Sequence, residues 1–196
     1  QGLHAVSSDG AGNLVAVGGL FGQMTRSWDN GVTWHRVLPG AGQSWPGLYA
    51  VGYAKGVWMA GGYNRIMRST DGGATWMDVS TTKGMRDVCY GNNRWFVTDT
   101  WNNTMYWSSN GTTWIPVVHA PGHGSGTSFS WVRSCAFADG LFVAVTEYGD
   151  IWTSESGRQV QQWRGAGGDP DMWAVTAGKR GFLATGGDFT LKYGSA

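Results

Sequence analysis

The sequence is short of charge, and this shortage excludes several functions. Charged residues make up 14% of the 196 residues, where a globular chain usually has about a quarter, and the formal net charge is +1. Lys and Arg form no runs, so the sequence does not favour binding to nucleic acid or to an anionic membrane surface. No apolar stretch approaches the roughly 18 residues that a transmembrane helix needs, so no membrane insertion is expected.

Cysteine, histidine and proline are scarce as well. The chain has two Cys, four His and five Pro. Two cysteines imply neither a disulfide framework nor a metal site, and we expect Cys89 and Cys135 to be small buried core residues. The histidines show no metal-ligand spacing, and no nucleophile elbow or phosphate-binding loop is present. We therefore expect no metal and no cofactor.

Glycine, tryptophan and one repeated phrase are what the sequence has in abundance. It contains 33 Gly and 13 Trp. Residues 27–34 and 69–76 both read Ser-x-Asp-x-Gly-x-Thr-Trp, and residues 108–114 are the same phrase one residue shorter. Residues 154–157, followed by Trp163, are a degraded copy. The copies recur every 39 to 46 residues, and a period near 40 with strand-like flanks is typical of β-propeller blades.

Between these phrases the sequence predicts four short strands in each repeat, joined by tight turns. Repeat two shows them best, at residues 47–52, 56–62, 65–69 and 75–79. The predicted fold class is therefore all-β: a small five-bladed β-propeller of about 39 residues per blade, with the last blade lacking its outer strand. It forms a single domain over residues 1–196, with blades at about 3–38, 47–80, 84–118, 131–164 and 171–196. A bare outer edge invites pairing, so a homo-oligomer or a larger parent protein stays open as an alternative.

The repeated phrase resembles the Asp-box, also called the bacterial neuraminidase repeat. This motif occurs in sialidases, sortilin-type receptors, xyloglucan hydrolases and photosystem II assembly factors, and all of them are β-propellers. Repeat two, with residues 48–51 and 68–76, is similar to a blade of the assembly-factor group. Repeats three and four, with residues 88–97 and 140–145, resemble propeller repeats of phage tail and appendage proteins. The resemblance implies a propeller fold and says little about activity.

The residues of the phrase have a structural interpretation. The Asp carboxylates can accept hydrogen bonds from turn amides, the Gly residues can take the positive φ of a tight hairpin, and the Trp side chains can pack over it. Asn110 can replace Asp without charge, so no catalytic carboxylate or metal ligand is required there. The predicted structural residues are Ser27, Asp29, Gly31, Trp34, Ser69, Asp71, Gly73, Trp76, Ser108, Asn110, Gly111 and Trp114.

A candidate binding face follows from aligning the repeats. In such propellers, ligands more often meet the loops that lead into the first strand and those that follow the second. The second residue of each predicted innermost strand changes chemistry while its neighbours stay apolar, and these residues are His4, Tyr49, Arg86, Arg133 and Trp173.

The loops after the second strands add further aromatic and polar side chains. Aromatic rings beside amides and a few charges suit sugar binding, because rings stack on pyranose faces and polar groups bind hydroxyls. The alternative is that these residues only cap a narrow central channel. The candidate ligand-binding residues are Tyr49, Arg86, Trp101, Arg133, Tyr148 and Trp173.

An enzymatic interpretation rests on three acids. Asp99, Glu147 and Asp188 fall at nearly the same place in repeats three, four and five, and converging carboxylates can act as the acid and base of a glycosidase. Five-bladed glycosidases are, however, much longer and carry large loops. The sialidase family also carries an Arg triad and six blades, which this short chain lacks. We therefore expect no catalytic residues and no enzyme.

The predicted function is a non-enzymatic binding module, lectin-like or receptor-binding, on a virion or a secreted protein. Its partner would be a glycan or a protein receptor, and its location extracellular or on the virion. Repeated weak sites on one rigid body gain avidity against a multivalent surface. The first alternative is a protein-interaction scaffold similar to the photosystem II assembly factors, and the second is a glycoside hydrolase.

Overall fold

Every regular element in the part of the chain that the structure describes is a β-strand. The structure is a computed structural model, and it describes residues 2–19, 22–38, 47–80, 83–99, 101–119, 129, 131–164, 171–179, 181–187 and 190–193. None of these residues belongs to a helix that could cross a membrane. The chain divides into two compact units, Gln1–Met85 and Arg86–Ala196, and each is described by itself.

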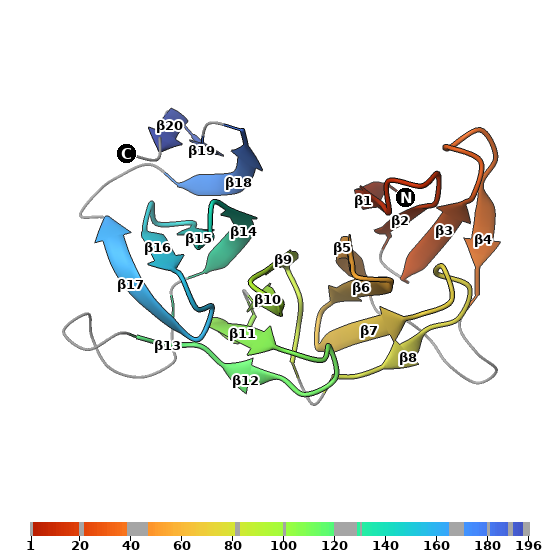
Figure 1. Ribbon diagram of the computed structural model, residues 1–196, viewed down its shortest axis with the longest axis horizontal. Helices are drawn as coiled ribbons and strands as arrows, with labels where there is room; N and C mark the ends of the chain where they lie inside the picture. The colour runs from red at the N-terminus through yellow and green to blue at the C-terminus, as the bar shows by residue number, and fades with distance from the viewer. Residues whose placement is uncertain are drawn as a thin grey trace. The chain divides into compact units, whose positions relative to one another are not determined.

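Unit 1 consists of two antiparallel four-stranded sheets, each with its strands in chain order (Figure 1). Sheet 1 contains β1 (Leu3–Ser8), β2 (Leu14–Gly18), β3 (Gln23–Ser27) and β4 (His35–Val37). Sheet 2 contains β5 (Leu48–Ala54), β6 (Val57–Gly62), β7 (Arg65–Ser69) and β8 (Met77–Asp78).

Unit 2 consists of three further sheets. Sheet 3 contains β9 (Asp87–Gly91), β10 (Arg94–Asp99), β11 (Thr104–Ser108) and β12 (Ile115–Pro116). Sheet 4 contains β14 (Val132–Ala138), β15 (Leu141–Thr146), β16 (Ile151–Ser154) and β17 (Gln159–Arg164), with β13 (Val118–His119) at its outer edge. Sheet 5 contains β18 (Met172–Gly178), β19 (Gly181–Gly186) and β20 (Thr190–Tyr193).

Tight hairpins join the first two strands of sheets 2, 3 and 4. Each loop has two residues with positive φ: Lys55 and Gly56 at 51° and 79°, Asn92 and Asn93 at 45° and 56°, and Asp139 and Gly140 at 48° and 80°. Two successive positive φ angles match the right-handed twist of the strands, and Asn, Asp and Gly adopt them at least cost. Local sequence therefore fixes where these strands begin and end.

The core of each unit lies between sheets that pack face to face. In unit 1, Val15 and Val17 of sheet 1 pack with Leu48 and Trp58 of sheet 2, and all four are nearly inaccessible to water. In unit 2, one cluster joins residues of sheets 3 and 4, and another joins residues of sheets 4 and 5. Sheet 4 is therefore covered on both sides, which explains why its strands are apolar on both faces.

The predicted all-β class is confirmed, and each predicted blade range holds the strands of one sheet, except that β13 of sheet 4 lies outside the range 131–164. The fifth sheet has three strands among the described residues. Residues 118 and 119, at the end of the predicted third blade and just beyond it, form β13, which pairs in parallel with β17 of sheet 4. Residues 194–196, at the end of the predicted fifth blade, lie outside the described residues.

Candidate functional site

The carboxylates of the repeated phrase are occupied by their own hairpins. Asp71 accepts hydrogen bonds from Thr75 N at 2.9 Å, Thr75 Oγ1 at 2.6 Å and Ser69 Oγ at 2.8 Å. Burial opposes ionisation of Asp71, but these hydrogen bonds outweigh it and lower its pKa to about 2. The equivalent hydrogen bonds, first of all from the Thr33 hydroxyl, lower the pKa of Asp29 to about 2.

The other residues of the phrase serve the same turns. Gly31, Gly73 and Gly111 have φ of 85°, 80° and 71°, a region that favours glycine. In the first two copies the indole N–H of Trp34 or Trp76 donates to the carbonyl oxygen of this glycine at 3.0 Å. In the third copy, the Asn110 side-chain oxygen accepts from the amides of residues 112 and 113 at 2.9 Å.

The innermost strands place their second residues at irregularities of the sheet. The register of β1 with β2 shifts around His4, and the same shift occurs around Tyr49 in β5, Arg133 in β14 and Trp173 in β18. A β-bulge leaves its extra residue out of the regular ladder and redirects its side chain. This gives a physical reason why these positions vary in chemistry while their neighbours remain apolar.

In unit 1, the bulged residues of the two sheets meet. The rings of His4 and Tyr49 stack with their centres 5.2 Å apart and an angle of 20° between their planes. Tyr49, a candidate ligand-binding residue, therefore has a ring partner within its own unit. Tyr63, in the turn between β6 and β7 of the same unit, is 52% exposed.

In unit 2, the bulged residues belong to a larger group, the Arg133 cluster, made of Trp131, Arg133, Glu147, Tyr148 and Trp173. Arg133 forms an ion pair with Glu147, and its guanidinium lies 5.9 Å from the ring centre of Trp131 and 6.0 Å from that of Trp173. The three aromatic side chains are 46%, 53% and 63% exposed, in the order Trp131, Tyr148, Trp173.

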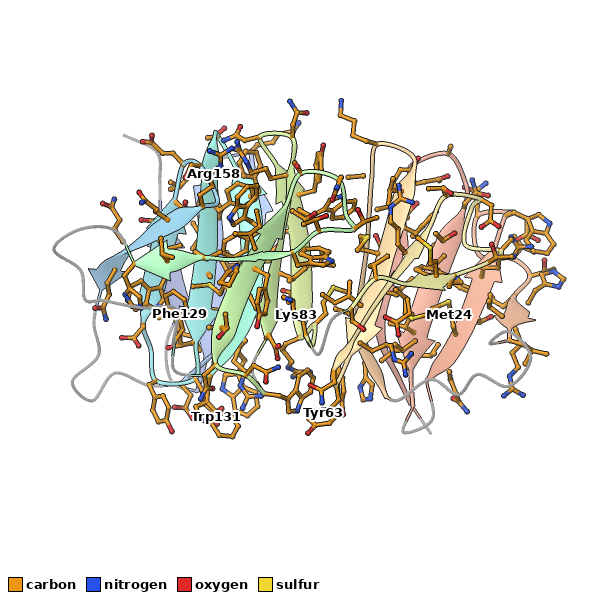
Figure 2. The ribbon with its side chains drawn as sticks, turned by 90° about the horizontal axis from the view of Figure 1, so that it is seen from below. Met24, Tyr63, Lys83, Phe129, Trp131 and Arg158 are labelled. Carbon is orange, nitrogen blue, oxygen red and sulfur yellow. The ribbon has the colours of Figure 1, made fainter. Side chains whose placement is uncertain are left out.

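Two backbone features support this cluster. Arg133 and Trp173 are the bulged residues of neighbouring strands, and Glu147 begins the turn between β15 and β16. The amide of Glu147 donates to the carbonyl oxygen of Trp131 at 3.1 Å, which links the turn to the segment before β14. Trp131 itself has φ of 43°, an unusual value for an aromatic residue. Figure 2 shows Trp131 beyond the strand ends of its unit.

The cluster combines exposed rings with a half-buried donor and acceptor. The side chains of Arg133 and Glu147 are 20% and 31% exposed, so a ligand can reach them, yet neighbouring atoms hold them in place. The guanidinium offers several N–H donors, and the carboxylate offers acceptors beside them. Stacking on the rings and hydrogen bonding to the ion pair are therefore available at one place.

Arg86 and Trp101, two further candidates, lie on sheet 3 of the same unit. Arg86 precedes β9, and its amide donates to the carbonyl oxygen of Thr98 at 2.7 Å. Trp101 lies in the turn between β10 and β11, and its amide donates to the Asp99 carboxylate at 3.2 Å. Both side chains are partly exposed.

Asp99 is not placed to act as a catalytic acid. It is fully buried, and its carboxylate accepts from Trp101 N at 3.2 Å and from the side-chain amide of Asn102 at 2.6 Å. Glu147 is held by Arg133. Asp188, the third acid, lies outside the described residues. Within those residues, no group of three or more His, Cys, Asp or Glu side chains is placed to hold a metal ion.

Sequence reasoning missed Trp131 and a polar chain that links the inner strands of unit 2. Asp87 Oδ2 accepts from Ser134 Oγ at 2.6 Å and from Cys135 N at 3.0 Å, and Ser134 Oγ accepts from Val175 N at 3.2 Å. Burial raises the pKa of Asp87, and the hydrogen bonds oppose the rise. The sequence did carry a signal for this chain, because Asp87 and Ser134 are polar residues at a position where the other repeats have Ala.

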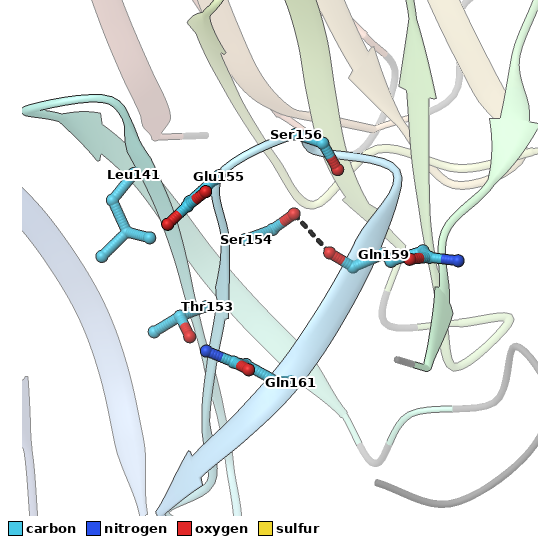
Figure 3. Close-up of a pocket in the computed structure, with 7 residues that line it drawn as sticks. All are labelled: Leu141, Thr153, Ser154, Glu155, Ser156, Gln159 and Gln161. Atoms are coloured by element: carbon cyan, nitrogen blue, oxygen red, sulfur yellow. Dashed lines mark hydrogen bonds between the residues drawn. The ribbon is translucent and has the colours of Figure 1, made fainter. Parts of the chain in front are cut away.

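A hollow of about 320 Å³ opens at the other end of sheet 4 (Figure 3). It lies at the start of β15 and around the turn between β16 and β17, whereas the Arg133 cluster lies at the start of β14 and the end of β15. No aromatic ring lines it, and Ser154 donates to the carbonyl oxygen of Gln159 across it. Its lining residues are Leu141, Thr153, Ser154, Glu155, Ser156, Gln159 and Gln161.

Solved structures resemble this chain, although no protein-family model and no curated protein matches it. The structure of YCF48 bound to D1 peptide matches 95% of this chain and 62% of its own, with 16% identity and a TM-score of 0.69. An ancestral GH74 enzyme matches over 94% and 27%, with 18% identity and a TM-score of 0.73. A chain of the nidogen/laminin complex matches over 94% and 72%, with 11% identity and a TM-score of 0.67.

These likenesses establish a β-propeller fold. At such low identity they establish nothing finer, because propellers host many unrelated functions. The chain also spans less than two thirds of the YCF48 chain and about a quarter of the GH74 chain. Function must therefore be argued from this chain's own side chains.

Proposed function

We propose that the protein is a non-enzymatic, lectin-like binding module that holds its ligand at the Arg133 cluster. The observation that carries this proposal is the meeting of exposed rings and an Arg–Glu pair at the bulged ends of neighbouring strands. Each exposed indole provides a large apolar face, and the C–H groups of a pyranose can pack on such a face. The ion pair can then hydrogen-bond the ring hydroxyls.

The proposal also includes three expectations that come from the sequence. The repeated phrase is the Asp-box, the propeller has five blades, and the module belongs to a virion or a secreted protein. In unit 1, the stacked rings of His4 and Tyr49 occupy the equivalent place, so the protein offers more than one aromatic surface. Several weak sites on one body suit a multivalent glycan surface.

A protein-interaction scaffold is the second candidate, and the likeness to YCF48 bound to a peptide favours it. Exposed aromatic and Arg side chains are also the residues that dominate protein interfaces. The two candidates share the Arg133 cluster and differ in what covers it.

A glycan-array screen of the purified protein tests the proposal. Wild type is compared with Trp173→Ala and Arg133→Ala, which remove a ring and the central cation of the cluster, and with Trp101→Ala on sheet 3. Trp28→Ala is the matched control, because Trp28 is 51% exposed and also carries an Arg, Arg26, 4.9 Å from its ring centre. All five proteins are first shown to unfold at similar temperatures.

The proposal expects specific glycan signals that fall at least tenfold in Trp173→Ala and Arg133→Ala and persist in Trp28→Ala. A blank array for folded wild-type protein contradicts it and favours the scaffold. Signals that persist in both cluster variants contradict the assigned site.

A further inference from the structure

The charges around the Arg133 cluster restrict the kind of sugar that it can hold. We infer, on the basis of the proposed function, that the cluster selects an uncharged pyranose with two adjacent hydroxyl groups over an acidic sugar. The inference rests on the pairing of Arg133, the acceptor beside it and the position of the two indoles.

The charge of Arg133 is already balanced inside the protein. Glu147 forms an ion pair with it, and the guanidinium also lies near two indole rings. A ligand carboxylate would have to displace Glu147 from Arg133 and would meet the negative charge of Glu147.

A diol suits the pair better than an anion does. Each hydroxyl group both donates and accepts one or more hydrogen bonds. The guanidinium can donate to the hydroxyl oxygens while the carboxylate accepts the hydroxyl protons, so neither charged group has to leave its partner. Charge-assisted hydrogen bonds of this kind are among the stronger ones in proteins.

The two indoles add an apolar surface close to the guanidinium. Trp173 is 63% exposed and Trp131 is 46% exposed, although both lie close to Arg133. A pyranose presents C–H groups on its faces and hydroxyls on its edge, so stacking on Trp173 directs the hydroxyl edge towards the ion pair.

The test is an array on which neutral hexoses and sialic or uronic acids end the same core glycans. Wild type is expected to bind the neutral glycans at least tenfold more tightly than the acidic ones. Its Kd for the best neutral glycan is expected to change less than twofold between 50 and 500 mM NaCl, because no net charge is neutralised on binding.

Glu147→Gln is the diagnostic variant, and Trp28→Ala is the control. The glutamine keeps the shape of the side chain but leaves the Arg133 charge unpaired. Binding to neutral glycans should fall about tenfold, and binding to acidic glycans should rise. Trp28→Ala should match wild type on both sets.

The inference and the proposed function fail differently. Wild-type preference for acidic glycans, with strong salt dependence, overturns the inference and leaves the lectin proposal standing. If that acidic binding is lost in Arg86→Gln, the cation of sheet 3 is the one in use. A blank array, or binding to immobilised peptides alone, overturns both.

Discussion

The hairpin of residues 69–76 makes a sharp prediction about acid stability. Asp71→Asn removes the charge of the carboxylate that accepts the Thr75 and Ser69 hydrogen bonds. An Asn side chain at the equivalent place of the third copy still accepts two turn amides, so the variant should fold. It should be less stable than wild type at neutral pH and lose this difference in acid.

The magnitude follows from the pKa of Asp71, which falls from 3.8 to about 2. Each pKa unit corresponds to about 1.36 kcal/mol, so the upper bound on the contribution is about 2.5 kcal/mol. The side chain is exposed, and screening by water reduces this to about 1 kcal/mol. Because the folded pKa is the lower one, this stability is present above pH 3.8 and is lost as the pH falls through about 2.

Urea unfolding of wild type and variant between pH 2 and pH 7 measures the difference. Asn110→Ala, at the equivalent place of the third copy, is the control: its side chain carries no charge, so its effect on stability should not change with pH. A constant difference between wild type and Asp71→Asn across this range would refute the account of the hairpin.

Three further predictions concern unit 2. Ser134→Ala should lower the free energy of unfolding by about 1 to 3 kcal/mol in urea, because Asp87 loses a donor in a half-buried place; no change would contradict the polar chain. Gly91→Ala should lower the free energy of unfolding, measured by thermal unfolding, by at least about 1 to 3 kcal/mol, because a Cβ there would lie 2.1 Å from an aromatic ring of sheet 4. A variant as stable as wild type would contradict this packing. Cys135 is buried and Cys89 is partly buried, and burial raises the pKa of both thiols. Both should react slowly with a thiol reagent in the native protein and quickly in urea, and fast native labelling of Cys135 would disprove its burial.

Most of the strands could be predicted because their signals are local. β7 occupies the residues expected from the sequence, since turn residues and β-branched or aromatic runs lie next to each other in the chain. The hairpin at Asp139 and Gly140 is set by two residues that adopt positive φ. Such features need no knowledge of the rest of the fold.

Features that depend on distant partners could not be predicted in this way. β13 forms because Val118 pairs with Gln159, 41 positions along the chain, and no local pattern signals a parallel partner. The bulge at Arg133 likewise depends on the register of β14 with β15.

The candidate site was predictable only in part. Aligned repeats singled out Arg133 and Trp173 as variable positions of the innermost strands and Tyr148 as a residue of the loop after a second strand. The contacts of Arg133 with Glu147 and Trp131 could not be predicted, because they depend on side chains from separate segments meeting in space. One repeat alone carries no information about such a meeting.

The most direct test of the Arg133 cluster is a ¹H–¹⁵N spectrum of the indole N–H groups during titration with the strongest neutral glycan from the array. The chain has 13 tryptophans, and the variants Trp131→Phe, Trp173→Phe and Trp28→Phe assign the three signals that matter. We predict saturable shifts of the Trp131 and Trp173 signals while the Trp28 signal stays in place. Shifts confined to other tryptophans, or no shift at saturating glycan, would contradict the assignment of the ligand to this cluster.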